Sequence, residues 1–218
     1  MALTVDFPAS SYDLTTVDAV VAALSLSPSD QASNSQYIGT LIKRASSFIS
    51  TYTNRVFAKE TVTETLTSNG GPRLVLSRTP IISINSVTYN NITVISSSEY
   101  EIEDADAGFL WRERGWTNTL IDVGGINPIY TRFGKYKWKV SYTAGFVLPP
   151  SQNVTLPGEL EQACIEIVKS WYLGRKRDTS VIRESIGEAS VTYADVTRYA
   201  AAIPITAKEI LNKWIKFD

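Results

Sequence analysis

Hydrophobic positions along the chain follow a helical period, then a strand-like alternation, then a helical period again. Between Ile38 and Tyr52 the apolar residues recur every three or four positions for about four turns, which is typical of an amphipathic helix. A shorter stretch from Val17 to about Leu26 has the same spacing. We therefore predict two helices in the first part of the chain.

Polar residues mark where these two helices begin. Thr16 precedes the first apolar run, and Ser27 is followed by Pro28 and Asp30. A Ser or Thr side chain can accept a hydrogen bond from a backbone N–H group of the first turn, and proline at the first helical position loses no hydrogen bond. An acidic residue in that turn is favoured by the positive end of the helix dipole.

Residues 59–147 have the pattern of strands. Thr, Val and Ile are frequent there, and Gly, Asn and Pro interrupt the runs. Lys135, Lys137 and Lys139 alternate with apolar residues, which predicts a strand with one solvent-exposed face and one apolar face. We expect residues 89–92 to form the tip of a hairpin, because Asn tolerates the backbone conformation of tight turns.

The acidic run at residues 99–106 allows more than one interpretation. Alternation and turn chemistry favour a strand, a turn at 104–108 and a further strand at 109–111. A calcium loop is disfavoured, because no Glu stands at the last position of the twelve-residue pattern. Together with Trp111 and Trp116, the acids leave open a carbohydrate- or ligand-binding β-module. An enzyme that uses Asp and Glu alone is a further alternative.

The helical period returns in the last third of the chain. Pro157 precedes a stretch with apolar residues on helical spacing up to Tyr172. Near the end, residues 206–209 match a capping box, and Ile205 and Ile210 are placed to pack on each other as a hydrophobic staple. We therefore predict two more helices here.

These patterns predict an α+β protein. Helices precede and follow one contiguous block of strands, whereas parallel sheets require strands and helices that alternate. We expect a small bundle of about four helices, with an antiparallel β-region inserted between the second and third helices. Residues 1–58 and 148–218 would form one helical domain, and residues 59–147 the inserted β-region.

Composition disfavours an enzyme. The 218 residues include no histidine and one cysteine, Cys164, so the commonest general base and metal ligand is missing. Cys164 lies on an apolar helical stripe and is expected to be a buried small hydrophobe. A lone cysteine suits a reducing cytosol. We predict no catalytic, metal or cofactor site, no signal peptide and no membrane span.

Two segments are candidates for contacts with partners. Arg175, Lys176 and Arg177 close the third predicted helix, where they either offset its dipole or contact DNA phosphate or an acidic partner. The formal net charge of -1 disfavours sequence-specific DNA binding. The last helix carries a wide apolar surface that either packs inside its own subunit or docks in a partner groove. Its residues are Ile210, Leu211, Trp214, Ile215 and Phe217.

Four segments, taken in order, carry a resemblance to a known family. They are 52–57 (YTNRVF), 74–84 with its Pro-Ile-Ile-Ser-Ile pattern, 140–146 (VSYTAGF) before a Pro-led helix, and Ser185-Ile186-Gly187-Glu188 with Val191-Thr192-Tyr193. In this order and spacing, the chain resembles the head-tail connector (adaptor, head-completion) proteins of tailed bacteriophages from about Leu14 to Phe217. The β-region is larger than in compact members of that family.

The resemblance implies a structural protein of the virion neck, without enzymatic activity or cofactor. Copies would assemble in the host cytoplasm into a homo-oligomeric ring below the portal protein. The ring would extend the channel for double-stranded DNA, without specific binding, and would offer a platform for a stopper or tail-completion protein. In this family the terminal helix region is implicated in docking to the portal.

Overall fold

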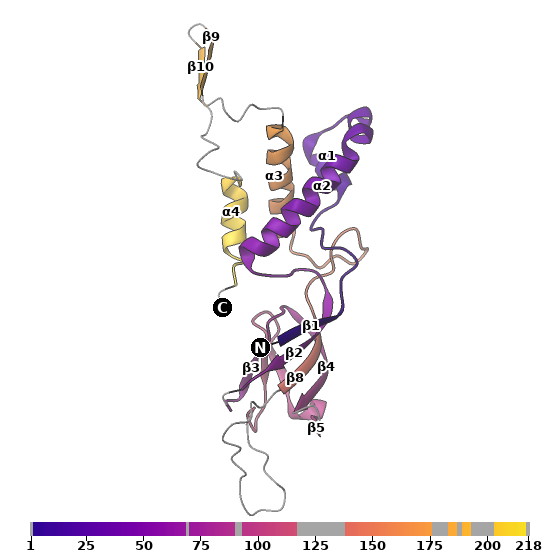
Figure 1. Cartoon of the computed structure of the whole chain (residues 1–218), viewed down its shortest axis with the longest axis vertical. Coiled ribbons are helices and arrows are strands. Elements are labelled where there is room, and N and C mark those ends of the chain that lie inside the picture. The colour runs from indigo at the N-terminus through magenta and orange to yellow at the C-terminus, as the bar shows by residue number, and fades with distance from the viewer. Residues whose placement is uncertain are drawn as a thin grey trace, which may run out of the picture. The chain divides into compact units, whose positions relative to one another are not determined.

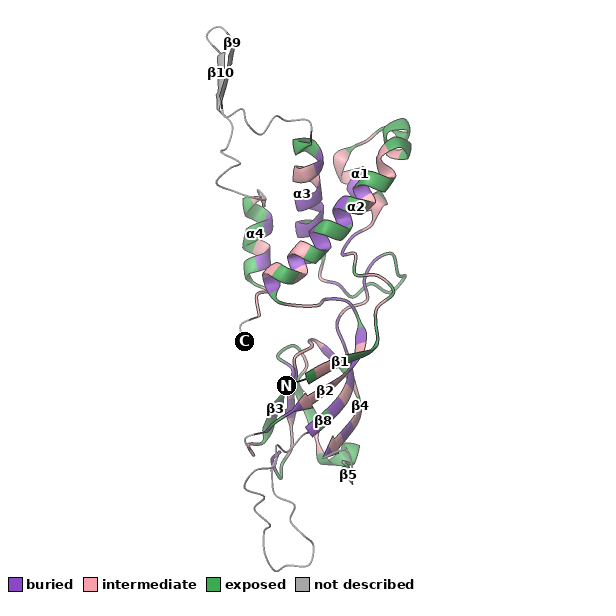
Figure 2. Cartoon of the chain, viewed as in Figure 1, coloured by how far each residue is buried: buried purple, intermediate pink, exposed green. Residues whose placement is uncertain are grey.

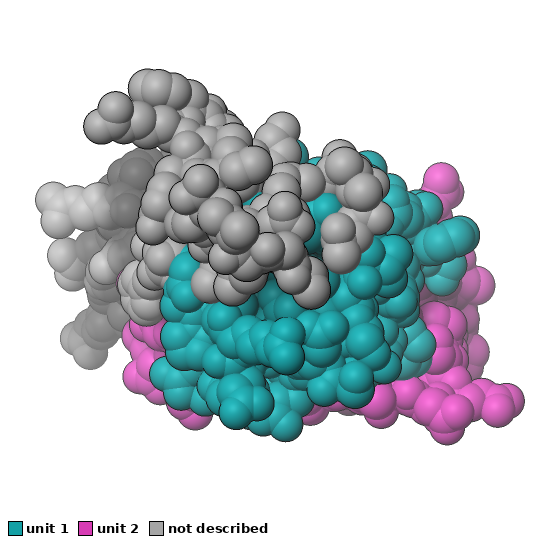
Figure 3. Space-filling model, turned by 90° about the horizontal axis from the view of Figure 1, so that it is seen from below, with its two compact units in different colours: residues 1–11, 56–147 teal, residues 12–55, 148–218 magenta. Residues whose placement is uncertain are grey.

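The computed structural model groups the chain into two compact units, which are described separately (Figure 3). The β-unit comprises residues 1–11 and 56–147, and the helical unit comprises residues 12–55 and 148–218. The structure describes residues 2–68, 70–89, 93–116, 138–175, 183–186, 189–192 and 203–216. Antiparallel strands between the second and third helices confirm the predicted α+β class.

The helical unit consists of helices and one hairpin in its described residues (Figure 1). The helices are α1 (Val17–Leu24), α2 (Pro28–Thr53), α3 (Gly158–Gly174) and α4 (Ile205–Asn212), and the hairpin strands are β9 (Arg183–Ile186) and β10 (Ala189–Thr192). Helix α3 packs against each of the other three helices. The core between them is apolar and includes the fully buried Val20, Ile38, Ile49, Ile167 and Leu211.

The predicted starts of α1 and α2 are confirmed. The Thr16 side chain accepts a hydrogen bond from the Ala19 N–H group, and the Ser27 side chain accepts one from Asp30 N–H, each at 3.2 Å. Pro28 is the first residue of α2. Both caps satisfy backbone donors that have no partner inside the helix.

The predicted start of α4 is wrong. Pro204, and not Thr206, precedes the helix, and no side chain caps it. The Thr206 hydroxyl instead donates a hydrogen bond to Glu166 on α3. Ile205 is 76% exposed, so it does not pack as a staple on Ile210. A tertiary partner on α3 therefore replaces the local capping pattern.

The β-unit contains two antiparallel sheets in its described residues. The five-stranded sheet has the order β1-β2-β8-β4-β5 and the three-stranded sheet the order β3-β7-β6. The strands are β1 (Ala2–Phe7), β2 (Glu60–Leu66), β3 (Arg73–Val75), β4 (Ile81–Tyr89), β5 (Thr93–Val94), β6 (Glu101–Asp104), β7 (Phe109–Trp111) and β8 (Trp138–Ala144). Strand β1 was not predicted, although Leu3, Val5 and Phe7 alternate with Thr4 and Asp6; most of its side chains are exposed.

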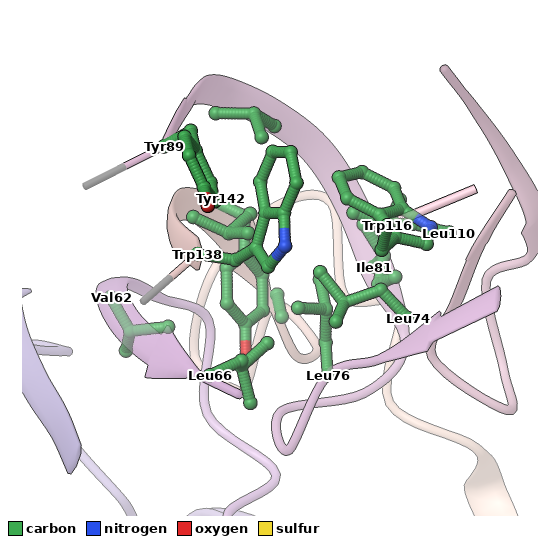
Figure 4. Close-up of a cluster of buried hydrophobic side chains, with 13 residues drawn as sticks. Val62, Leu66, Leu74, Leu76, Ile81, Tyr89, Leu110, Trp116, Trp138 and Tyr142 are labelled. Carbon is green, nitrogen blue, oxygen red and sulfur yellow. The ribbon is translucent and has the colours of Figure 1, made fainter. Parts of the chain in front are cut away.

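Both sheets contribute to one hydrophobic core (Figure 4). Trp116 and Trp138 meet edge to face, with ring centroids 5.0 Å apart, and Tyr89 lies 4.8 Å from Trp138. The three-stranded sheet adds Leu74 and Leu110. Such aromatic contacts add about 0.5–1.5 kcal/mol each beyond the area they bury.

The predicted hairpin of the acidic run is confirmed. Strands β6 and β7 pair antiparallel, and a turn at residues 105–108 joins them. Gly108 has φ +80°, and a Cβ atom there would come within 2.8 Å of the Leu76 carbonyl oxygen. Only glycine fits this conformation without strain. Strands β4 and β5 also form the predicted hairpin, although residues 90–92 at its tip lie outside the described residues.

Candidate interaction surfaces

The last helix packs on its own helical unit through one face. Helix α4 has both buried and exposed positions (Figure 2). Leu211 is fully buried, whereas Ile210, Trp214 and Ile215 are half-buried. Phe217 lies outside the described residues. Burial of Leu211 stabilises the unit by about 1.5–3 kcal/mol. This residue therefore serves the core, and the half-buried positions remain the candidates for contact with a partner.

The end of α2 holds the C-terminal segment in place. The Tyr52 hydroxyl donates a hydrogen bond to Asn212 Oδ1 at 2.7 Å, and the Thr53 carbonyl oxygen accepts one from Lys216 N–H at 2.9 Å. The Arg55 guanidinium lies 6.0 Å from the centre of the Trp214 ring. Segment 52–57, which carried part of the family resemblance, thus contacts the segment after α4.

A second contact fixes Trp214 against α3. Its indole N–H donates a hydrogen bond to Glu159 Oε1 at 2.7 Å. Glu159 lies in the first turn of α3, where a carboxylate is favoured by the helix dipole. The Lys213 ammonium lies 4.0 Å from the other oxygen of the same carboxylate. Trp214 therefore joins the ends of α3 and α4.

The Arg175 side chain makes contacts within the helical unit. Its guanidinium carbon lies 3.9 Å from the centre of the Tyr172 ring and 5.5 Å from that of Tyr37. The same group donates hydrogen bonds to Asn34 Oδ1 at 2.9 Å and to the Tyr172 hydroxyl at 3.1 Å. It connects the end of α3 to α2. Lys176 and Arg177 lie outside the described residues.

The aromatic residues of the acidic region have different surroundings. Trp116 is fully buried and donates its indole N–H to the Pro72 carbonyl oxygen at 2.9 Å, so its ring cannot stack on a sugar. Trp111 is half-buried and lines a hollow of about 390 Å³ together with Tyr100 and Glu113. The hypothesis of a carbohydrate-binding module rested on these two tryptophans, and of the two only Trp111 borders open space.

Arginines neutralise two carboxylates of the acidic run. Arg112 donates to Glu99 Oε2 at 2.6 Å, and Arg73 forms two hydrogen bonds with Glu103. The hydrogen bond from Arg73 holds the pKa of Glu103 below its ordinary value. In the described part of the chain no three Cys, Asp or Glu side chains form a group that could hold a metal ion.

The β-unit contains a buried carboxylate that the sequence pattern did not indicate. Glu64 is fully buried and accepts hydrogen bonds from Ser77 N–H at 2.9 Å, from the Ser77 hydroxyl and from the Tyr142 hydroxyl at 2.8 Å. Tyr142 in turn accepts from Arg78 N–H at 3.0 Å. Burial and the nearby Glu64 raise the pKa of Tyr142. The network fixes the β3–β4 connection on the sheet, and nothing in it indicates catalysis.

The lone cysteine is buried, as predicted. Cys164 contacts the Ser46 hydroxyl at 3.8 Å, and Ser46 accepts a hydrogen bond from Leu14 N–H at 3.0 Å. Burial raises the pKa of the thiol to about 12. A thiol that stays protonated is a poor nucleophile.

Within the described residues, no helix is both long enough and apolar enough to span a bilayer.

The fold matches that of chains in solved structures of gene transfer agent (GTA) particles. Three solved structures match over 100% of this chain and 97% of theirs: the neck of an empty GTA particle computed with C6 symmetry (TM-score 0.58, 15% identity), the virion of a native gene transfer agent particle (0.56, 16%) and the neck of a native GTA particle computed with C12 symmetry (0.54, 15%). At these identities the likeness shows the fold. A search of curated proteins gave no match.

The family model for the head completion protein matches residues 13–217. The chain therefore belongs to the head completion protein family, which confirms the predicted class of head-tail connector proteins and their location in the virion. Family membership also supports a structural role. We accordingly interpret the contacts made by Leu211, Trp214 and Arg175 as ones that stabilise the fold of the subunit.

Proposed function

We propose that copies of this chain form a ring in the virion neck, below the portal. The ring extends the DNA channel and provides the platform for a stopper or tail-completion protein. The observation that supports this most is the family match over residues 13–217, together with the fold shared with neck proteins of particles computed with C6 and C12 symmetry. In this role the protein catalyses no reaction.

The charge of the chain is compatible with a DNA channel. With a formal net charge of -1, the subunit does not grip phosphates strongly, and strong binding would hinder passage of the genome. We expect weak DNA binding that disappears between low and physiological salt. Residues 175–177 remain a candidate for DNA or partner contact, carried by Lys176 and Arg177, because Arg175 bonds Asn34 and Tyr172.

We assign portal docking to the outer positions of the last helical segment. Ile210 and Ile215 are half-buried, so they can lose further exposed area against a groove, while Leu211 and Trp214 keep the segment folded. Phe217 stays part of this proposed surface. Removal of the whole segment would not test the idea, because it would also remove Leu211 from the core.

Microscopy of the purified protein with the portal tests the ring. Negative-stain images should show rings with rotational symmetry that bind the portal. The variant Ile210→Glu should weaken portal binding by about tenfold or more, because a charge in a desolvated contact is costly. The matched variant Glu209→Ala, on an exposed position next to it, should bind normally. Equal binding by both variants would contradict the docking assignment.

A further inference from the structure

The β9–β10 hairpin lacks a partner strand among the described strands. Its two strands pair only with each other, over four residues each. A two-stranded hairpin is marginally stable in water, and three or more strands or a packed face are needed for independent stability. Further strands at its edges would therefore stabilise the hairpin.

Backbone geometry leaves hydrogen-bonding groups at both edges. In an antiparallel ladder, alternate residues direct their N–H and C=O groups at the partner strand, and the residues between direct theirs outward. Each four-residue strand thus has two residues that face its outer edge. Two N–H and two C=O groups on each side make about four hydrogen bonds available to a neighbouring strand.

The number of strands decides which sheet can continue around a ring in antiparallel fashion. Rotation about an axis preserves strand direction along that axis. β9 and β10 run in opposite directions, so β10 of one copy meets β9 of the next antiparallel. The five-stranded and three-stranded sheets have odd numbers of antiparallel strands, so their edges, such as β1 and β5, would meet only in parallel.

We propose that the hairpins of neighbouring copies join edge to edge, β10 of one copy with β9 of the next, into one closed antiparallel sheet around the ring. The occupant of each free edge is thus a second copy of this chain. A closed sheet has no unpaired edge, which removes the hazard of uncontrolled pairing with other chains. The inference rests on the proposed function, because it requires a ring.

Mixed single-cysteine chains test the pairing directly. Ser185→Cys and, separately, Arg183→Cys place a thiol on β9, while Ser190→Cys and Thr192→Cys place one on β10, so that together they sample the register. Adjacent strands lie ~4.8 Å apart, within disulfide reach, and strands two apart lie ~10 Å apart, beyond it. The native Cys164 is buried and serves as the unreactive background.

A one-to-one mixture of a β9 variant with a β10 variant should yield disulfide-linked dimers upon mild oxidation. Roughly a quarter of the junctions in a random assembly hold both thiols, which sets the expected yield for the best pair. Each variant alone should yield no more disulfide-linked dimer than the control variant Val75→Cys, which changes an exposed position of the β-unit.

Rings that form in every sample without a β9–β10 cross-link above the Val75→Cys level would overturn the inference, and so would cross-links between like strands. Microscopy of the same samples separates this from failure of the proposed function. A protein that forms no rings contradicts the ring itself, and the closed sheet with it.

Discussion

The helical unit and the β-unit bury their side chains in different ways. In the described residues of the helical unit, the buried polar side chains are the hydroxyls of Thr15, Ser46 and Thr53, and the rest of the core is apolar. The β-unit buries two carboxylates, Glu60 and Glu64, on the core face of β2. The helical unit therefore depends on packing, whereas the β-unit also depends on particular hydrogen bonds.

Glu64→Ala should have the largest effect on stability. Without the carboxylate, the buried donors of Ser77 and Tyr142 lose their acceptor, at a cost of about 1–3 kcal/mol each. We expect a loss of about 3–5 kcal/mol confined to the β-unit. Hydrogen exchange of peptides from each unit measures it. Glu101→Ala, on the exposed strand β6, is the matched control; equal protection in both variants would contradict the account.

Leu211→Ala should destabilise the helical unit by about 2–5 kcal/mol, because it removes a fully buried side chain and leaves a cavity. Ile205→Ala on the same helix changes a position that is 76% exposed and should alter stability by less than about 0.5 kcal/mol. Thermal unfolding of the two variants checks this. Similar losses for both would mean that α4 packs differently.

Arg175→Lys should cost the helical unit about 0.5–1 kcal/mol. Lysine keeps the charge but loses the planar stack on Tyr172 and the paired hydrogen bonds. Urea unfolding measures the loss. Arg175→Ala, which removes the charge, should leave DNA affinity unchanged at every salt concentration, and a smaller salt dependence of binding would assign Arg175 to DNA instead.

The smallest expected effect is on the stability of the protein at low pH. The pKa of Glu103 is lowered in the folded protein by Arg73, so the ion pair contributes stability above the ordinary pKa of the carboxyl group and loses it as the pH falls through the folded value. Glu103→Gln should therefore match the parent protein at an acid pH below the folded pKa of Glu103 and be slightly less stable at pH 7. Urea unfolding at both values checks the sign, and a variant that is more stable at pH 7 would reverse it.

Periodicity identified the helices because burial there follows one apolar stripe. Strand β2 gives no such signal: one face carries Glu60, Val62, Glu64 and Leu66, and the other carries threonines, so alternation alone does not tell which face is buried. The start of α4 escaped prediction because Glu166, distant in sequence, binds Thr206. Among the candidate residues, Leu211 was placed on the apolar surface of the last helix by its spacing. The spacing did not tell whether this residue lies in the core of its own unit or contacts a partner.

We propose that copies of this structural subunit close into a ring with the portal. Electron microscopy of the full-length protein mixed with purified portal tests it most directly. We expect symmetric rings seated on the portal, with every subunit in the same environment. A protein that stays monomeric at high concentration and never associates with the portal would contradict it.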